Sequence, residues 1–177
     1  MRAIARHAQA ATAGVIGLVL RHRRAVRLVL LGMMCLVLAG AAWRLYRGRY
    51  WQDDDRIVMT FYLVPMYLLA LGWAGVMLGQ PRLLLPMAVW VDVLAVAVAV
   101  SRTMTTIIPA SGHVVFLLYS LLVTPHRAYR LLAGAYLAAT LLAKFVLWHD
   151  VITPVLGGVI AWALWRLRLR AARAPAC

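Results

Sequence analysis

Two histidines, His113 and His149, lie at the edges of strongly apolar segments. His113 ends the stretch IIPASGH, residues 107–113, and His149 is followed directly by Asp150. Two imidazoles can act as nucleophile and general acid in a transfer reaction. A carboxylate can hold an imidazole in one tautomer and stabilise its charged form. These three residues are therefore the candidate catalytic groups.

A candidate anion site adjoins His113. Ser111 and Gly112 would open a helix, and the unpaired N–H groups of a helix N-terminus bind anions. Arg102 and Lys144 would add positive charge nearby. A helix cap and a turn are the simpler explanation of the Ser-Gly pair taken alone, but the whole set favours phosphoryl transfer on a lipid headgroup. The histidines and the adjacent acid lack the usual spacing of a metal site, so we expect no metal and no cofactor.

The composition is typical of a membrane protein. Of the 177 residues 65% are hydrophobic, whereas a soluble domain is about half apolar. A spanning helix needs about 20 mostly apolar residues, so the chain has room for about six. We predict an all-α polytopic membrane protein, a bundle of six transmembrane helices at about residues 28–43, 57–78, 83–100, 111–124, 126–147 and 151–165.

The basic residues indicate topology rather than nucleic-acid binding. Nearly all of them lie between apolar segments or at the termini, which explains the net charge of +14. With the N-terminus in the cytoplasm, 13 basic residues fall inside and six outside, as the positive-inside rule favours. We expect a basic cytoplasmic or interfacial segment at 1–27, a membrane domain at 28–165 and a basic cytoplasmic tail at 166–177. The location would be a bacterial plasma membrane, with lipids as the surroundings.

This topology brings the two histidines to one face of the membrane. The segments 111–124 and 126–147 would form an antiparallel hairpin, with Thr124 and Pro125 capping and starting its second helix. His113 begins the first helix and His149 follows the second, so both would lie at the outer face although 36 residues separate them.

The same residues resemble a known family, the type-2 phosphatidic acid phosphatase superfamily of membrane lipid phosphatases and phosphotransferases. The stretch Pro109-Ala110-Ser111-Gly112-His113 resembles its P-S-G-H motif. His149, followed by Val155-Leu156-Gly157-Gly158, resembles its last motif, in which a histidine precedes V-L-A-G. The resemblance covers about residues 100–160.

The resemblance implies a phosphohistidine mechanism at the outer face. His149 would be the nucleophile, His113 would protonate the leaving alcohol, and N–H groups around Ser111 and Gly112 would hold the phosphoryl oxygens. The chain departs from the family at three charged positions, and Ala110 is inserted in its P-S-G-H segment. No lysine stands seven residues before Arg102, and the expected Arg and Asp are replaced by Ala143 and Thr153.

The sequence leaves three interpretations of function open. The first is a lipid phosphatase or phosphotransferase, and the second is a catalytically inactive lipid-binding, transport or partner-subunit protein on the same scaffold, which the three departures favour. The third, a proton-coupled carrier, rests on Asp92 within an apolar segment. A charged residue at mid-membrane is costly, and we expect Asp92 to pair with a basic group, to bond Tyr62 or Tyr67, or to be protonated.

Overall fold

The chain is an all-α protein, as its sequence predicts. The structure is a computed structural model that describes residues 2–51, 54–104 and 110–173, with side chains over 7–47, 63–101 and 110–173. Within these ranges the regular elements are all helical. In chain order they are α1 (Arg2–Arg21), α2 (Arg23–Trp51), α3 (Asp54–Gly79), the 3-10 turn η1 (Pro81–Leu83), α4 (Pro86–Met104), α5 (Gly112–Val123), α6 (Arg127–Leu142), the π turn η2 (Ala143–Leu147) and α7 (Ile152–Arg173).

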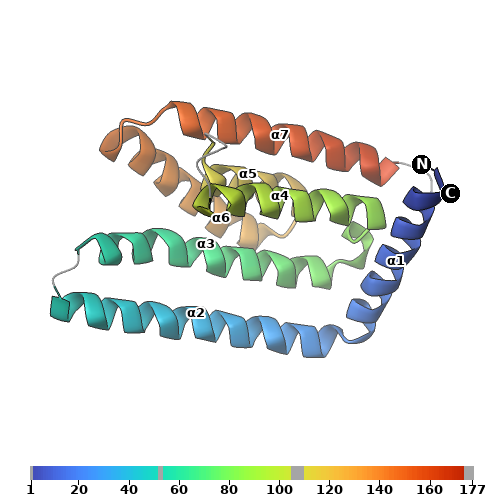
Figure 1. Cartoon of the computed structure of the whole chain (residues 1–177), viewed down its shortest axis with the longest axis horizontal. Coiled ribbons are helices and arrows are strands. Elements are labelled where there is room, and N and C mark those ends of the chain that lie inside the picture. The colour runs from blue at the N-terminus through green and yellow to red at the C-terminus, as the bar shows by residue number, and fades with distance from the viewer. Residues whose placement is uncertain (1, 52–53, 105–109, 174–177) are drawn as a thin grey trace.

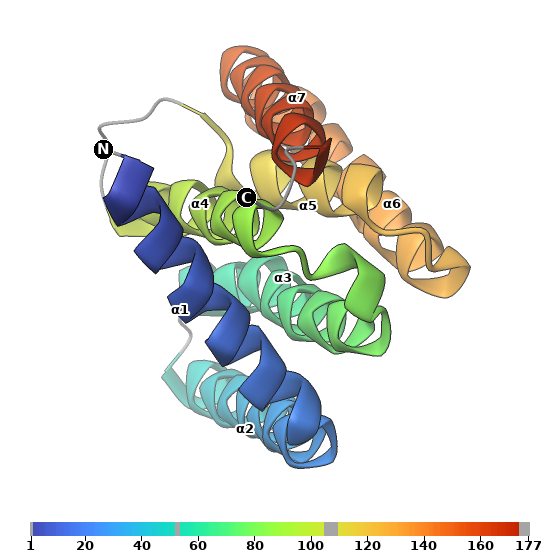
Figure 2. The same ribbon diagram turned by 90° about the vertical axis from the view of Figure 1, so that its right-hand side faces the viewer.

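Helix α1 crosses one end of a bundle formed by the longer helices. Helices α2, α3, α4 and α7 run roughly along the long axis of the molecule, and α1 lies steeply across them (Figure 1). The end-on view in Figure 2 shows α1 passing over α4 and α2. Trp90 of α4 donates its indole N–H to the hydroxyl of Thr12 on α1 at 3.0 Å. The start of α1 and the end of α7 lie at the same end of the bundle.

Among the described residues, three helices are long and apolar enough to cross a membrane. They span Arg23–Arg47, Arg127–Leu147 and Ile152–Arg173. The described apolar parts of the other three expected spans are shorter, at Leu63–Gly79, Pro86–Ser101 and Gly112–Val123. Helix α5 has 12 residues, which at about 1.5 Å per residue give about 18 Å, against a hydrocarbon layer of about 30 Å.

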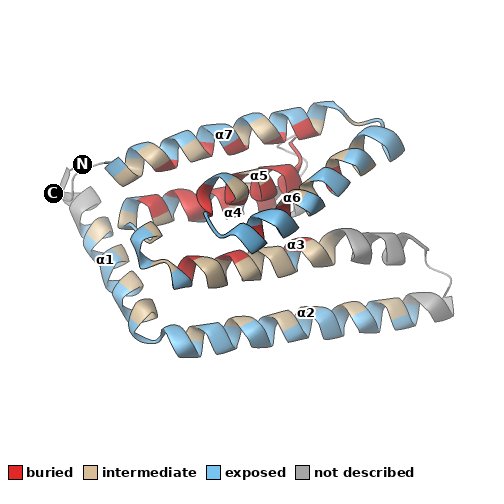
Figure 3. Cartoon of the chain, turned by 180° about the vertical axis from the view of Figure 1, so that it is seen from behind, coloured by how far each residue is buried: buried red, intermediate tan, exposed pale blue. Residues whose placement is uncertain are grey.

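The short helix α5 forms the centre of the protein. Nine of its 12 residues are buried, and it packs against α4, α6 and α7. Phe116 and Tyr119 are almost fully buried, and Trp73 of α3 meets both rings edge to face, with centroids 5.7 and 6.3 Å away. Figure 3 shows the buried residues concentrated on α5 and on the faces of α4 and α7 turned toward it. An apolar helix that other helices cover over most of its surface belongs in a protein core.

Helix α2 is the least buried of the long helices. It packs mainly on α3 and is exposed along most of its length (Figure 3). Leu28, Val29 and Leu36 are each at least 60% exposed. A large exposed apolar surface marks contact with lipid or with a partner, and on a helix of this length and hydropathy it is suited to lipid.

A buried ion pair joins α4 to α7. Asp92 Oδ1 accepts a hydrogen bond from Arg168 Nε at 2.8 Å, and Asp92 Oδ2 accepts one from Arg168 Nη2 at 3.3 Å. The same Nη2 donates to the carbonyl oxygen of Leu83 at 2.8 Å, and the hydroxyl of Tyr119 donates to Asp92 Oδ1. The expected pairing of Asp92 with a basic group is therefore confirmed.

The partners of Asp92 differ from the expected ones in two respects. The hydroxyl comes from Tyr119 of α5; Tyr67 is 47% exposed, and the side chain of Tyr62 lies outside the described ranges. The base comes from the segment expected to be a tail, because α7 continues through residues 166–173. The side chain of Arg168 is 8% exposed and points into the bundle.

Candidate functional site

The Ser-Gly pair fastens the start of α5 to the start of α7. The backbone N–H of Ser111 donates to the carbonyl oxygen of Thr153 at 2.9 Å. Ser111 is the N-cap of α5, with extended backbone angles, and its side chain makes no capping hydrogen bond. The bond joins positions 42 residues apart in sequence, so the two segments that resemble the family motifs lie side by side.

Gly112 and Gly157 allow three helices to approach closely. A Cβ on Gly112 would lie 2.2 Å from the carbonyl oxygen of Ala99 on α4. A Cβ on Gly157 of α7 would lie 3.0 Å from the Ser111 carbonyl oxygen and 3.1 Å from Val114 Cβ. Only a hydrogen fits at Gly112 without displacing the backbone of α4. The small residues therefore have a packing role at this junction.

His113 is buried behind this junction. It is 6% exposed, and its ring centroid lies 6.3 Å from that of Tyr136 on α6, at a tilted angle. Thr140 lies one turn further along α6, on the same face as Tyr136, and is 2% exposed. The Thr140 hydroxyl makes no hydrogen bond within the described residues. A buried imidazole thus lies close to a phenol and to a helix face that carries an unpaired hydroxyl.

His149 lies in a strained, exposed turn. The π turn η2 ends α6, with Trp148 N–H donating to the Ala143 carbonyl at 3.2 Å, and Asp150 N–H then donates to the Lys144 carbonyl at 2.9 Å. Between these bonds His149 adopts a φ of 52°. A residue with a Cβ rarely takes this left-handed conformation, and the strain costs about 1 kcal/mol or more. Its side chain is exposed.

Lys144, Asp150 and Thr153 form a polar cluster next to the Ser111 bond. Lys144 Nζ lies 2.9 Å from Asp150 Oδ2 and 3.3 Å from Thr153 Oγ1. Thr153 donates its backbone N–H to Asp150 Oδ1 at 3.1 Å and its hydroxyl to Asp150 Oδ2. The Thr153 hydroxyl, followed by Lys144, stabilises the carboxylate and lowers the pKa of Asp150 from 3.8 to about 2. Asp150 is therefore ionised at neutral pH.

The π turn explains how Lys144 reaches this cluster. In a regular helix a shift of one residue turns a side chain by about 100°, so Lys144 would not replace an arginine at Ala143. A π turn accommodates one extra residue and so changes the direction in which the neighbouring side chains point. Lys144 lies within the π turn over residues 143–147, and its ammonium group points at Asp150 and Thr153.

The structure thus brings some of the expected site residues together. Ser111 is joined through Thr153 to Lys144 and Asp150. The contacts of Asp150 run to lysine and threonine, whereas we expected them to orient an imidazole. Arg102 belongs to α4, and its side chain lies outside the described ranges.

Three residues at the candidate site were not identified from the sequence: Tyr136, Thr140 and Thr153. Thr153 was noted only as the residue that replaces the expected Asp. A signal for Thr153 was present. Asp150 three residues before Thr153 has the spacing of a helix N-cap and its N3 residue, and Asp150 does accept the Thr153 N–H. The expected cap of α6 at Thr124 was wrong, because His126 is the N-cap and its Nδ1 accepts from Tyr129 N–H at 3.3 Å.

Comparisons of the chain with protein families, with curated proteins and with solved structures give no match.

Proposed function

We propose that the chain is an integral membrane protein that acts on a lipid phosphate, as a phosphatase or phosphotransferase. The observation that supports this most strongly is the Ser111–Thr153 hydrogen bond. It brings the Ser-Gly-His segment beside the turn that carries His149, and these are the two segments whose residues suit phosphoryl transfer.

In the proposed reaction, an imidazole nitrogen of His149 attacks the phosphorus of a lipid phosphate. The bond between phosphorus and the lipid oxygen breaks, and His113 gives a proton to the departing alcohol. Water, or a second alcohol, then attacks the phosphohistidine and releases phosphate or a new phosphoester. The exposure of His149 leaves its imidazole accessible to a headgroup, whereas the burial of His113 fixes its position.

Positive charge at the site comes from Lys144. Its side chain is 14% exposed, so its field is less screened than that of a surface lysine. In the proposed complex the phosphate oxygens replace the Asp150 carboxylate at Lys144 Nζ, and Asp150 keeps its two bonds from Thr153. Ser111 and Gly112 bring the N-terminal end of α5 to the same place.

We further propose the six-span topology, with both termini in the cytoplasm of a bacterial cell and the site facing outward. The common end of α1 and α7 supports this arrangement, since an even number of crossings returns the chain to its starting side (Figure 1). The site lies where α5 and α7 begin, at the other end of α7. A lipid substrate would then enter from the bilayer between the helices.

The test is release of phosphate from phosphatidate in detergent micelles by wild type and by two histidine variants. Asn takes the left-handed conformation readily, so His149→Asn removes the imidazole and preserves the turn. His126→Asn is the matched control, because Asn is a good N-cap and His126 caps α6 at the opposite end of the hairpin. We expect His149→Asn to lose turnover and His126→Asn to retain it. Equal turnover in all three proteins would refute the nucleophile assignment.

A second candidate is a catalytically inactive lipid-binding, transport or partner-subunit protein. The internal bonds of the site favour it: Ser111 N–H is bound to Thr153, and Lys144 is paired with Asp150. Such a protein would bind phosphatidate and release no phosphate. Binding without turnover in wild type, abolished in Lys144→Met, would decide for this candidate.

A further inference from the structure

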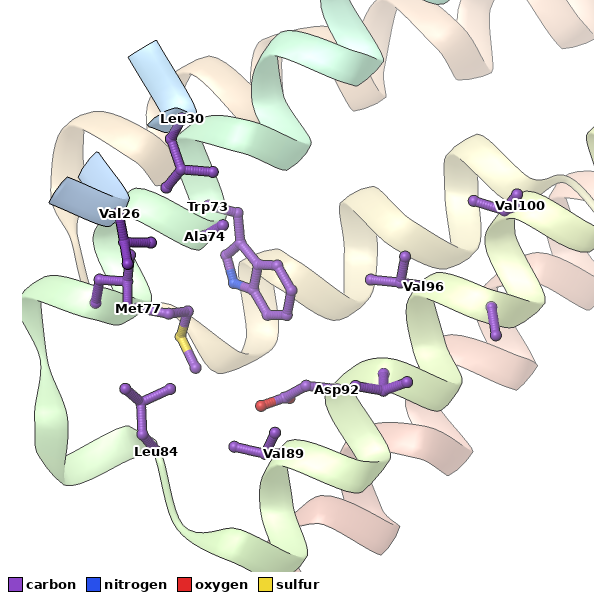
Figure 4. Close-up of a pocket in the computed structure, with 13 residues that line it drawn as sticks. Val26, Leu30, Trp73, Ala74, Met77, Leu84, Val89, Asp92, Val96 and Val100 are labelled. Carbon is purple, nitrogen blue, oxygen red and sulfur yellow. The ribbon is translucent and has the colours of Figure 1, made fainter. Parts of the chain in front are cut away.

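A groove of about 630 Å³ lies between α2, α3 and α4. Val26 and Leu30 of α2 lie beside Trp73 of α3, and α4 forms the opposite wall (Figure 4). Its volume is within the range of about 300–1,000 Å³ that small organic ligands occupy. Val93 and Val100 line it and are 53% and 41% exposed, so the groove opens on the surface of the bundle.

Two polar groups reach this otherwise apolar groove. The indole of Trp73 extends into it toward Asp92 (Figure 4). Trp73 is 7% exposed, and its N–H has no hydrogen-bond acceptor among the described residues. A buried donor without an acceptor is uncommon in folded proteins. Asp92, by contrast, is already bonded to Arg168 and Tyr119. The wall of the groove therefore contains one unsatisfied donor, whose nitrogen is itself shielded from solvent.

We propose that this groove binds an uncharged lipid with an oxygen acceptor near the end of an apolar chain, such as an acylglycerol. The apolar walls would hold the chain, and a small rotation of the buried indole would let the ester or hydroxyl oxygen accept from Trp73 N–H. A lipid tail alone supplies no acceptor for that donor. The groove goes beyond the proposed function, because none of the candidate catalytic or phosphate-binding residues lines it.

Charge selects against ionised lipids in this groove. Asp92 and Arg168 carry one charge each and neutralise one another at 2.8 Å. An added carboxylate or phosphate near Asp92 would meet a like charge and find no unpaired cation among the residues that line the groove. A neutral headgroup meets neither penalty. We therefore expect 1-oleoylglycerol to bind and oleate to bind weakly.

The test uses 1-oleoylglycerol with a diazirine in its chain and the full chain in detergent micelles. After illumination, peptide mapping by mass spectrometry should place the label on α3 and α4 along the groove. Unlabelled 1-oleoylglycerol should compete at least tenfold better than oleate or octadecane. Label scattered over the exposed helices, or equal competition by all three compounds, would overturn the proposal.

Four variants separate a specific site from general lipid contact. Trp73→Phe removes the N–H, retains an aromatic ring, and should weaken binding about fivefold, the effect of one neutral hydrogen bond. Ala97→Phe fills the groove from an exposed position and should abolish specific labelling; Ala163→Phe, at an exposed position of α7 outside the groove, should not. His149→Asn should leave binding unchanged, so this site and the phosphate site fail independently. Unchanged binding in Ala97→Phe would overturn the proposal even if Trp73→Phe failed to fold.

Discussion

Replacing Arg168 by methionine should destabilise the protein more than any other arginine-to-methionine change at the end of α7. The change retains an apolar stem of similar length and removes the guanidinium. Asp92 then loses two charge-assisted hydrogen bonds, and the Leu83 carbonyl loses one. Both side chains of the pair are 8% exposed, so water does not replace the lost donors.

The number of lost hydrogen bonds sets the magnitude. A hydrogen bond to a charged group contributes about 1.5–3 kcal/mol, so two such bonds give about 3–6 kcal/mol. Removal of one partner of a buried ion pair costs about 3–5 kcal/mol by an independent measure. We therefore expect Arg168→Met to lower the free energy of unfolding by about 4 kcal/mol, with Tyr119 remaining as a donor to the orphaned carboxylate.

The assay is unfolding in detergent micelles, followed by circular dichroism. Arg166→Met is the matched control, since Arg166 is exposed and contacts the ring of Trp162 with its guanidinium carbon 5.5 Å from the centroid. It should cost less than about 1 kcal/mol. The double variant Asp92→Asn with Arg168→Met removes both charges and should be at least about 1.5 kcal/mol more stable than Arg168→Met alone. Equal losses in Arg168→Met and Arg166→Met, or a double variant no more stable than Arg168→Met, would refute the reasoning.

Two further changes test the junction and the polar cluster. Gly112→Ala should cost more than about 3 kcal/mol in a melting experiment, because its Cβ would lie 2.2 Å from the Ala99 carbonyl oxygen. Gly134→Ala is its control, since a Cβ there meets nothing within 4 Å, and it should raise the free energy of unfolding by about 0.5–1 kcal/mol. Similar effects at both glycines would contradict the packing role of Gly112. The lowered pKa of Asp150 stabilises the folded state above about pH 4, and this contribution is lost as pH falls toward 2. The drop in the pKa from 3.8 to about 2 corresponds to about 2 kcal/mol, which solvent screening reduces to about 1 kcal/mol. The difference in the free energy of unfolding between wild type and Asp150→Asn should therefore disappear between pH 4 and 2. A difference that does not change with pH would argue against the stabilised carboxylate.

The helices and the hairpin could be predicted from hydropathy, but the depth of each helix in the bundle could not. The segment 111–124 is as apolar as its neighbours, yet it forms a short central helix whose surroundings are other helices. Hydropathy measures preference for an apolar medium, and protein core and lipid satisfy it equally. In contrast, the pairing of Asp92 follows from the cost of a lone buried charge, a local argument that needs no knowledge of its partner.

The proximity of the two candidate segments could be predicted from the sequence, whereas the contacts of their side chains could not. The residue types singled out the segments at Ser111 and His149 as candidates. The hairpin indicated that these segments meet, because its second helix ends on the side of the membrane where its first helix begins. The contacts made by Lys144 and Asp150 depend on a π turn and on a left-handed His149, and neither is encoded in residue spacing. Backbone geometry of this kind depends on the packing of the whole junction.

The most direct test of the proposed function is to trap the phosphoenzyme. Wild type, His149→Asn and His126→Asn would each be mixed briefly with phosphatidate labelled with ³²P at its phosphate, and quenched in alkali, where phosphohistidine survives. We predict label on wild type and His126→Asn, mapped to His149, lost on acid treatment and missing from His149→Asn. Absence of labelled protein in wild type that nevertheless releases phosphate, or label on His149→Asn, would contradict the proposed mechanism.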